Sequence, residues 1–82
     1  MGEQILDALR PAFPDVEVNV ALERLTDRYN GYVLSQGFKN LSFVQRQSQV
    51  FALLREHLGA EAQRISMLFT YTPDEYKQLQ AA

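Results

Sequence analysis

Cysteine is absent from the 82-residue sequence, and histidine occurs once, as His57. Without cysteine the chain supplies no disulfide, no thiolate nucleophile and no cysteine ligands for zinc or an iron–sulfur cluster. One imidazole does not make a metal site, and His57 falls in the last turn of an expected helix, where its charge interacts favourably with the helix dipole. The residues offer no catalytic or metal-binding constellation, so we expect a protein that is not an enzyme and holds no cofactor.

Long apolar runs are also missing. The longest, Val50–Leu54, has five residues, whereas a membrane-spanning helix needs about 20. The N-terminus, Met1–Gln4, is acidic where a secretory signal would be basic, which favours a cytoplasmic protein. Because a chain of this length buries only about 60 to 65% of its unfolded surface, we predict one domain over residues 1–82.

The charged side chains are unevenly distributed. The net charge of −2 argues against a strongly basic nucleic-acid binder. Residues 34–72, however, carry four basic side chains against two acidic ones. Among them, Lys39, Arg46 and Arg64 would form a modest anion-binding surface. The alternative is that Arg46 simply solvates its helix or pairs with a nearby carboxylate.

The first part of the chain predicts a helix and two strands. Residues 3–12 place apolar side chains at helical spacing, and Pro11 and Pro14 end that helix. Residues 16–20 alternate between β-branched apolar and polar residues and predict a strand, while residues 20–25 also fit one or two helical turns. A turn near Thr26-Asp27 leads into a second strand over residues 29–36, which completes a hairpin.

A second helix is predicted over Phe43–Leu58. Ser42 and Gln45 match a capping box, in which each side chain bonds to the other residue's backbone N–H, and Gly59 provides the C-terminal stop. The core stripe is expected to comprise Phe43, Val50, Phe51, Leu54 and Leu58, and the exposed side Arg46, Gln49, Arg55 and Glu56.

A third strand and a short last helix are predicted next. Thr72 supplies an N-cap, Pro73 the first helical position and Glu75 the N3 residue of this helix, which is expected to bury Tyr76 and Leu79. The strand covers residues 63–71, with Ile65, Met67, Phe69 and Tyr71 on one face and Arg64, Ser66, Leu68 and Thr70 on the other.

Together these elements predict an α+β fold with the order α-β-β-α-β-α. A hairpin followed by a helical crossover gives a three-stranded mixed sheet with the helices on one face, a two-layer sandwich. The prediction depends on the third strand lying beside the second, covered by the Phe43–Leu58 helix.

The element order and several residues resemble the BolA-like family, whose small domain is similar to a type II KH fold. Val16-Glu17-Val18 stands where the family has its first strand, and residues 70–76 resemble its Thr-x-Thr-Pro-x-x-Trp motif. The resemblance spans residues 16–76. A family pattern of strand-end Ser, then Phe, then Ser-x-x-Gln-Arg and Val is met by Ser35, Phe38, Ser42, Gln45, Arg46 and Val50.

The resemblance implies two activities: partnership with monothiol glutaredoxins around a shared 2Fe–2S cluster, and regulation of transcription by DNA binding. Two family histidines are replaced by Gln47 and Arg64, which do not substitute for imidazole as iron ligands. The Gly-x-x-Gly loop with which KH domains clamp nucleic acid is also absent. We therefore expect a regulatory module with a protein partner, for which the resemblance suggests a monothiol glutaredoxin. DNA or RNA binding is the alternative, and 2Fe–2S handling with a glutaredoxin is a second alternative.

Two groups of side chains are candidates for binding. The surface expected to contact a partner or nucleic acid comprises Lys39, Arg46, Gln47 and Arg64. A platform on which bases stack would instead use Tyr29, Tyr32, Phe69 and Tyr71. Because aromatic residues at strand period usually fill a core, we expect these four to pack inside the protein.

Overall fold

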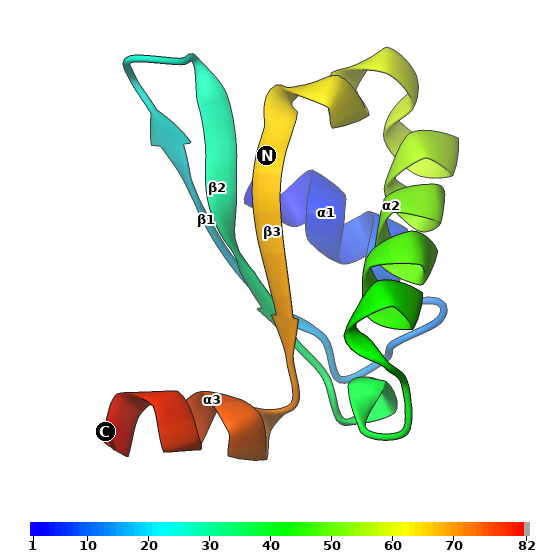
Figure 1. Ribbon diagram of the computed structural model, residues 1–82. Coiled ribbons are helices and arrows are strands. Elements are labelled where there is room, and N and C mark those ends of the chain that lie inside the picture. Colours follow the sequence, from blue (N-terminus) through cyan, green and yellow to red (C-terminus); the bar gives the residue numbers. More distant parts are fainter. Residues whose placement is uncertain (82) are drawn as a thin grey trace.

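A computed structural model describes residues 1–81 (Figure 1). It confirms the predicted order of elements, with two short 3-10 turns added. None of the helices within these residues combines the length and apolar character that crossing a membrane requires. The elements are α1 (Gly2–Leu9), β1 (Glu17–Glu23), β2 (Arg28–Leu34), η1 (Gln36–Phe38), α2 (Phe43–Leu58), η2 (Gly59–Arg64), β3 (Ile65–Tyr71) and α3 (Pro73–Ala81).

The three strands form one mixed sheet in the order β1-β2-β3. β1 and β2 are antiparallel, whereas β2 and β3 are parallel and pair from Tyr29↔Ile65 to Leu34↔Tyr71. The predicted pairing of the second and third strands is therefore confirmed. It places two strand ends and the loops that follow them, at Leu34 and Tyr71, side by side at one end of the sheet, and α3 begins there (Figure 1).

The β1–β2 hairpin is longer than its sequence pattern indicates. β1 continues to Glu23, which pairs with Arg28, so the alternative of helical turns over residues 20–25 is wrong. The connecting turn places Asp27 at a φ of 55°, a left-handed conformation that aspartate tolerates better than most residues. Within the hairpin, a Cβ added to Gly31 would lie 2.0 Å from the Asn19 carbonyl oxygen. Only glycine fits at this position without moving the backbone.

The hydrophobic core lies between the sheet and a layer formed by α1 and α2 (Figure 1). α1 ends at Leu9, three residues before the predicted end. The Ser42–Gln45 capping box that opens α2 is confirmed, with both of its hydrogen bonds present. Fully buried core side chains come from both helices, from β2 and from η1, namely Ile5, Leu9, Val33, Phe38, Val50 and Leu54.

A polar contact fixes the loop that precedes β1 against the end of β2. The Ser35 hydroxyl donates to one Asp15 carboxylate oxygen at 2.6 Å, and the Gln36 backbone N–H donates to the other at 2.8 Å. Both bonds favour the ionised form, so they lower the pKa of Asp15 below its ordinary value of 3.8.

Two assignments on α2 are wrong. Phe43 is 57% exposed and does not belong to the core stripe, because the first turn of α2 extends past the core toward the start of α3. Arg46 is only 7% exposed, although it was assigned to the solvent side. Its long side chain lies over the end of β3, where the Thr70 backbone carbonyl accepts one of its N–H groups.

The faces of β3 also differ from expectation. Leu68 and Thr70 point to the core, while Met67 and Phe69 are exposed on the opposite, open face of the sheet. The prediction that the four aromatic strand residues pack inside is therefore wrong, because Phe69 is exposed and Tyr29, Tyr32 and Tyr71 are only half-buried and lie outside the core. Alternation identifies residues that share a face but does not show which face the helices cover. Ile65 joins the core because the β2–β3 register shifts just after it.

α3 lies outside the helix layer, at the end of the sheet (Figure 1). None of its residues is buried, and Leu79 is 56% exposed. The prediction that it buries Tyr76 and Leu79 is wrong, since α3 contacts the open face and one sheet end rather than the core. Tyr76 is half-buried because its ring stacks on Tyr32 at a centroid distance of 4.7 Å.

Candidate functional site

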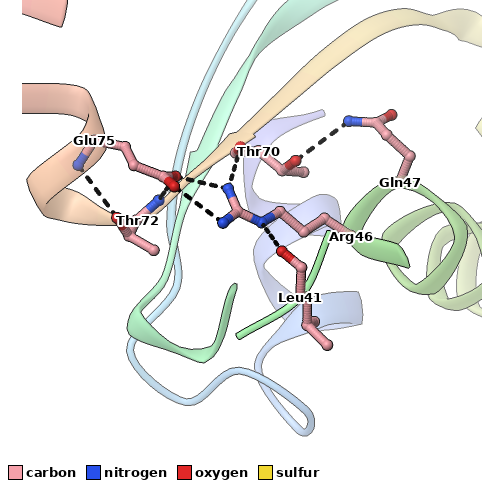
Figure 2. A network of polar contacts seen from close by, with 6 residues as sticks. All are labelled: Leu41, Arg46, Gln47, Thr70, Thr72 and Glu75. Carbon is pink, nitrogen blue, oxygen red and sulfur yellow. Dashed lines mark hydrogen bonds and ion pairs between the residues drawn. The ribbon is translucent and has the colours of Figure 1, made fainter. Parts of the chain in front are cut away.

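Arg46 is the centre of a polar network that joins α2, β3 and α3 (Figure 2). Its Nε donates to the Leu41 carbonyl at 3.1 Å, and one terminal nitrogen donates to the Thr70 carbonyl at 3.2 Å. The two terminal nitrogens donate to the two Glu75 carboxylate oxygens at 2.6 and 3.0 Å. This bidentate geometry is the strongest arrangement available to an arginine and a carboxylate.

Glu75 has a second role in the same network. It is the N3 residue of α3, and it accepts the Thr72 backbone N–H at 2.8 Å while its own N–H donates to the Thr72 hydroxyl. The donation from Arg46, followed by that from Thr72, lowers the pKa of Glu75 from 4.5 to about 2. The carboxylate that caps α3 therefore also fastens it to α2 (Figure 2).

The outer edge of β3 is closed by side chains of α2. Gln47 donates to the Leu68 carbonyl at 2.9 Å and approaches the Thr70 hydroxyl at 3.4 Å. Arg46 covers the next outward carbonyl, that of Thr70. Two carbonyls that an added strand would need are already hydrogen-bonded, so this edge is protected.

A groove of about 740 Å³ lies beside the network, between the start of α2 and α3. Its apolar lining is formed by Phe43, Tyr71 and Leu79, with the first and last of these more than half exposed. Asp74 and Gln78 add polar groups to the lining, and Arg46, Thr70 and Glu75 complete it.

Aromatic rings continue this apolar surface onto the open face of the sheet. Phe69 stacks on Tyr71 with a centroid distance of 6.0 Å and an interplanar angle of 12°. Beyond them, the hydroxyl groups of Tyr32 and Tyr76 lie 2.8 Å apart. The shared hydrogen bond with Tyr32 raises the pKa of Tyr76 above 10.0.

The four residues predicted as one binding surface lie in three places. Arg46 and Gln47 are adjacent at the β3 edge, and Lys39 is exposed after η1. Arg64 stands before the opposite end of β3, roughly 20 Å away at 3.3 Å per strand residue. There it pairs with Asp27 at 3.5 Å and Glu61 at 3.8 Å. Because Glu75 already neutralises Arg46, the alternative that Arg46 pairs with a nearby carboxylate is the one observed.

Most residues of the groove, among them Phe43, Glu75 and Leu79, are not identified as functional from the sequence. Phe43 and Leu79 were assigned to the core, and Glu75 was identified only as a helix cap. An apolar residue at the first position of a helix, beyond the capping Ser42, was the one available signal for exposure at Phe43.

Metal ligands do not gather in this structure. Within residues 1–81, no three side chains of the metal-binding types come together. At the positions of the two family histidines, Gln47 hydrogen-bonds to β3 and Arg64 takes part in ion pairs. Neither side chain provides an iron ligand.

Comparison with known proteins identifies the architecture. No family model matches the sequence, and no curated protein matches it significantly. Among solved structures, BolA1 from Arabidopsis thaliana superposes with a TM-score of 0.67 at 23% identity, covering 90% of this chain and 93% of that one. The chain has the BolA fold.

Two further structures with the BolA fold agree with this result. The BolA domain of SufE1 from Arabidopsis thaliana gives a TM-score of 0.68 at 22% identity over 90% of this chain and 93% of that chain. A Bol-like protein from Babesia bovis gives 0.59 at 20% identity, over 98% of this chain and 93% of that one. The BolA fold is thus present over nearly the whole length of the chain.

Proposed function

We propose that this chain is a non-enzymatic BolA-like module that docks a protein partner in the groove between α2 and α3. The observation that carries the proposal is the pair Phe43 and Leu79, which are 57% and 56% exposed on opposite sides of one groove. Large apolar side chains gathered around a concavity are typical of docking surfaces. One similar structure is a BolA domain of a protein named SufE1, which supports a modular role.

The groove is pre-formed, which favours binding. The Arg46–Glu75 pair and the Thr72–Glu75 capping box hold α3 at a fixed position relative to α2. A partner therefore loses little free energy in ordering this surface. Burying a Phe or Leu side chain completely contributes about 1.5 to 3 kcal/mol, so Phe43 and Leu79 are sufficient for a central cluster of strong contacts.

Charge defines the partner further. Within residues 1–81, Asp74 forms no ion pair, whereas Glu75 is compensated by Arg46. The groove lining therefore carries one net negative charge. We infer that the occupant is an amphipathic helix that places apolar residues between Phe43 and Leu79 and a basic residue beside Asp74.

Nucleic-acid binding is less well supported by the same geometry. Arg46, the central cation of the predicted anion-binding surface, is buried and neutralised by Glu75. Arg64 is engaged with two carboxylates at the far end of β3. Phosphate binding depends on clustered and available basic groups, and these two are neither clustered nor free of partners.

The test compares the partners captured by a groove variant with those captured by a control variant that loses an apolar side chain outside the groove. Phe43→Ser/Leu79→Ser removes both sides of the groove, while Leu25→Ser alters a residue that is 95% exposed in the hairpin turn. We expect at least one protein to be retained quantitatively by the wild type and by Leu25→Ser, and lost by the groove variant. Direct titration of that protein should then be competed by an amphipathic basic helix.

Two outcomes would overturn the proposal. One is that every captured protein is held equally by the groove variant and the wild type. The other is tight binding of duplex or single-stranded nucleic acid that weakens as salt is added. On duplex DNA, the logarithm of the binding constant then falls with the logarithm of the salt concentration with a slope of about 0.9 per neutralised phosphate. Measuring the affinity of the protein for duplex and for single-stranded nucleic acid at two salt concentrations identifies the second outcome.

A further inference from the structure

The two edges of the sheet are treated differently by the rest of the molecule. At β3, Gln47 and Arg46 hydrogen-bond to the outward carbonyls of Leu68 and Thr70. At β1, the residues between 17 and 23 have no hydrogen-bond partner on their outer side within the described part of the chain. In Figure 1, β1 lies at the margin of the sheet, and among the described residues no strand pairs with its outer side. Within the described part of the chain, β1 is therefore the edge at which the sheet can be extended.

The side chains of β1 define what could pair with it. Val18 and Val20 are half-buried against the helix layer, and Asn19 and Ala21 are exposed on the open face. Glu17 and Glu23 mark the two ends of the strand on that same open face, and both are exposed.

These two glutamates are electrostatically available. Within residues 1–81 neither Glu17 nor Glu23 forms an ion pair, and Glu23 makes one hydrogen bond, from the Leu25 backbone N–H at 3.1 Å. Two uncompensated carboxylates on one face, six residues apart, are a charge pattern that a basic strand complements.

We propose that the β1 edge accepts an extended segment of a partner protein as a fourth strand. The segment places apolar residues toward α1 and a basic residue opposite each of Glu17 and Glu23. Backbone hydrogen bonds to alternate residues of β1 provide the affinity, and the two glutamates select the sequence. A second copy of the chain is a poor occupant. Antiparallel self-pairing centred on Val20 would set Glu17 opposite Glu23 at both ends, and like charges directly opposite are destabilising.

This edge is a different surface from the groove, and the experiment keeps the two apart. The probes are two capped heptapeptides, Lys-Val-Thr-Val-Thr-Val-Lys and Glu-Val-Thr-Val-Thr-Val-Glu, each carrying a fluorophore. The alternation matches β1 in either direction. Affinities are measured by fluorescence anisotropy, and amide hydrogen exchange of β1 is measured with and without peptide.

We expect the wild type to bind the lysine peptide about tenfold more tightly than the glutamate peptide, because two facing charge pairs change sign. The lysine peptide should slow exchange at alternate β1 amides. Glu17→Lys/Glu23→Lys should reverse the preference. The matched control Glu3→Lys/Glu56→Lys, which alters exposed charges on the helices, should keep the wild-type preference.

Other results would overturn the proposal. Failure of the lysine peptide to bind the wild type, or to protect β1 amides, excludes a strand site at this edge. If Glu17→Lys/Glu23→Lys prefers the lysine peptide over the glutamate peptide as strongly as the wild type does, these carboxylates do not select the segment. Loss of peptide binding in Phe43→Ser/Leu79→Ser would place the peptide in the groove, which refutes the edge site while leaving the groove as a docking surface.

Discussion

Replacing Glu75 with glutamine tests the network that holds α3. Glutamine is also accepted at the N3 position of a capping box, so Glu75→Gln keeps the cap on Thr72 and removes the charge that faces Arg46. The substitution leaves the Arg46 guanidinium, which is buried, beside a neutral amide. We expect a loss of folding free energy at pH 7 that disappears in acid.

The size of the loss follows from the pKa of Glu75. A fall from 4.5 to about 2 corresponds to about 3.4 kcal/mol at 1.36 kcal/mol per pKa unit. Because 45% of the Glu75 side chain is exposed, solvent screening reduces this to about 1 to 2 kcal/mol. Since the folded pKa is depressed, the stabilisation is complete above pH 4.5 and is lost as the pH falls toward about 2.

Urea unfolding followed by circular dichroism, repeated between pH 7 and pH 2.5, measures this dependence. The wild type should exceed Glu75→Gln by about 1 to 2 kcal/mol at pH 7, and the gap should narrow steadily below pH 4.5. Asp74→Asn is the matched control, because it removes the neighbouring carboxylate but not the pair with Arg46.

A constant difference between the wild type and Glu75→Gln across the whole pH range would refute the reasoning. It would mean that the cost of the substitution comes from packing or capping and not from the charge of Glu75. The reasoning would also be refuted if the stability difference between the wild type and Asp74→Asn narrowed with falling pH in the same way as the difference for Glu75→Gln.

Three further predictions concern the sheet and its loops. Gly31→Ala should lower the free energy of unfolding by roughly 2 to 3 kcal/mol, because the new methyl group meets a backbone carbonyl. Thermal unfolding measures this loss. The control Gly2→Ala, whose Cβ makes only an ordinary contact at 3.7 Å, should leave the stability unchanged. Asp15→Asn should cost about 1 kcal/mol at pH 7 and progressively less below pH 3.8, since a lowered pKa stabilises only the ionised state. Urea unfolding at several pH values checks this, and a loss independent of pH contradicts it. Gln47→Ala should cost about 1 kcal/mol and speed hydrogen exchange along β3, whereas Gln49→Ala, on the exposed side of α2, should change neither.

Much of the fold could be predicted from local sequence signals. The capping box at Ser42 and the N-cap, proline and N3 glutamate from Thr72 to Glu75 mark helix starts through backbone chemistry that acts over three residues. The alternation over residues 63–71 identified the strand, and the hairpin followed by a helix fixed its parallel partner. The caps and the alternation are local signals that the sequence carries directly, and the strand pairing follows from the order of the elements.

The candidate site could not be predicted in the same way. Phe43, Phe69 and Leu79 are apolar, and periodicity places such residues in a core unless the neighbouring element is known to be elsewhere. Their exposure results from the position of α3, outside the helix layer, and that position depends on the contact between Arg46 and Glu75, 29 residues apart. The sequence shows both charged residues, but it does not show that the fold brings them into contact.

The closed edge of β3 also sets an upper limit on how many molecules can be joined through their sheets. A fibre built by edge-to-edge pairing of sheets needs two free sheet edges on every subunit, because each subunit must pair with a neighbour on both sides. This protein has Gln47 and Arg46 across one margin, so any strand added at the other completes a finite pair. Each molecule therefore pairs with one partner strand through its sheet. Substitutions that remove the side chains covering β3 would expose a second edge and allow open-ended fibres to form.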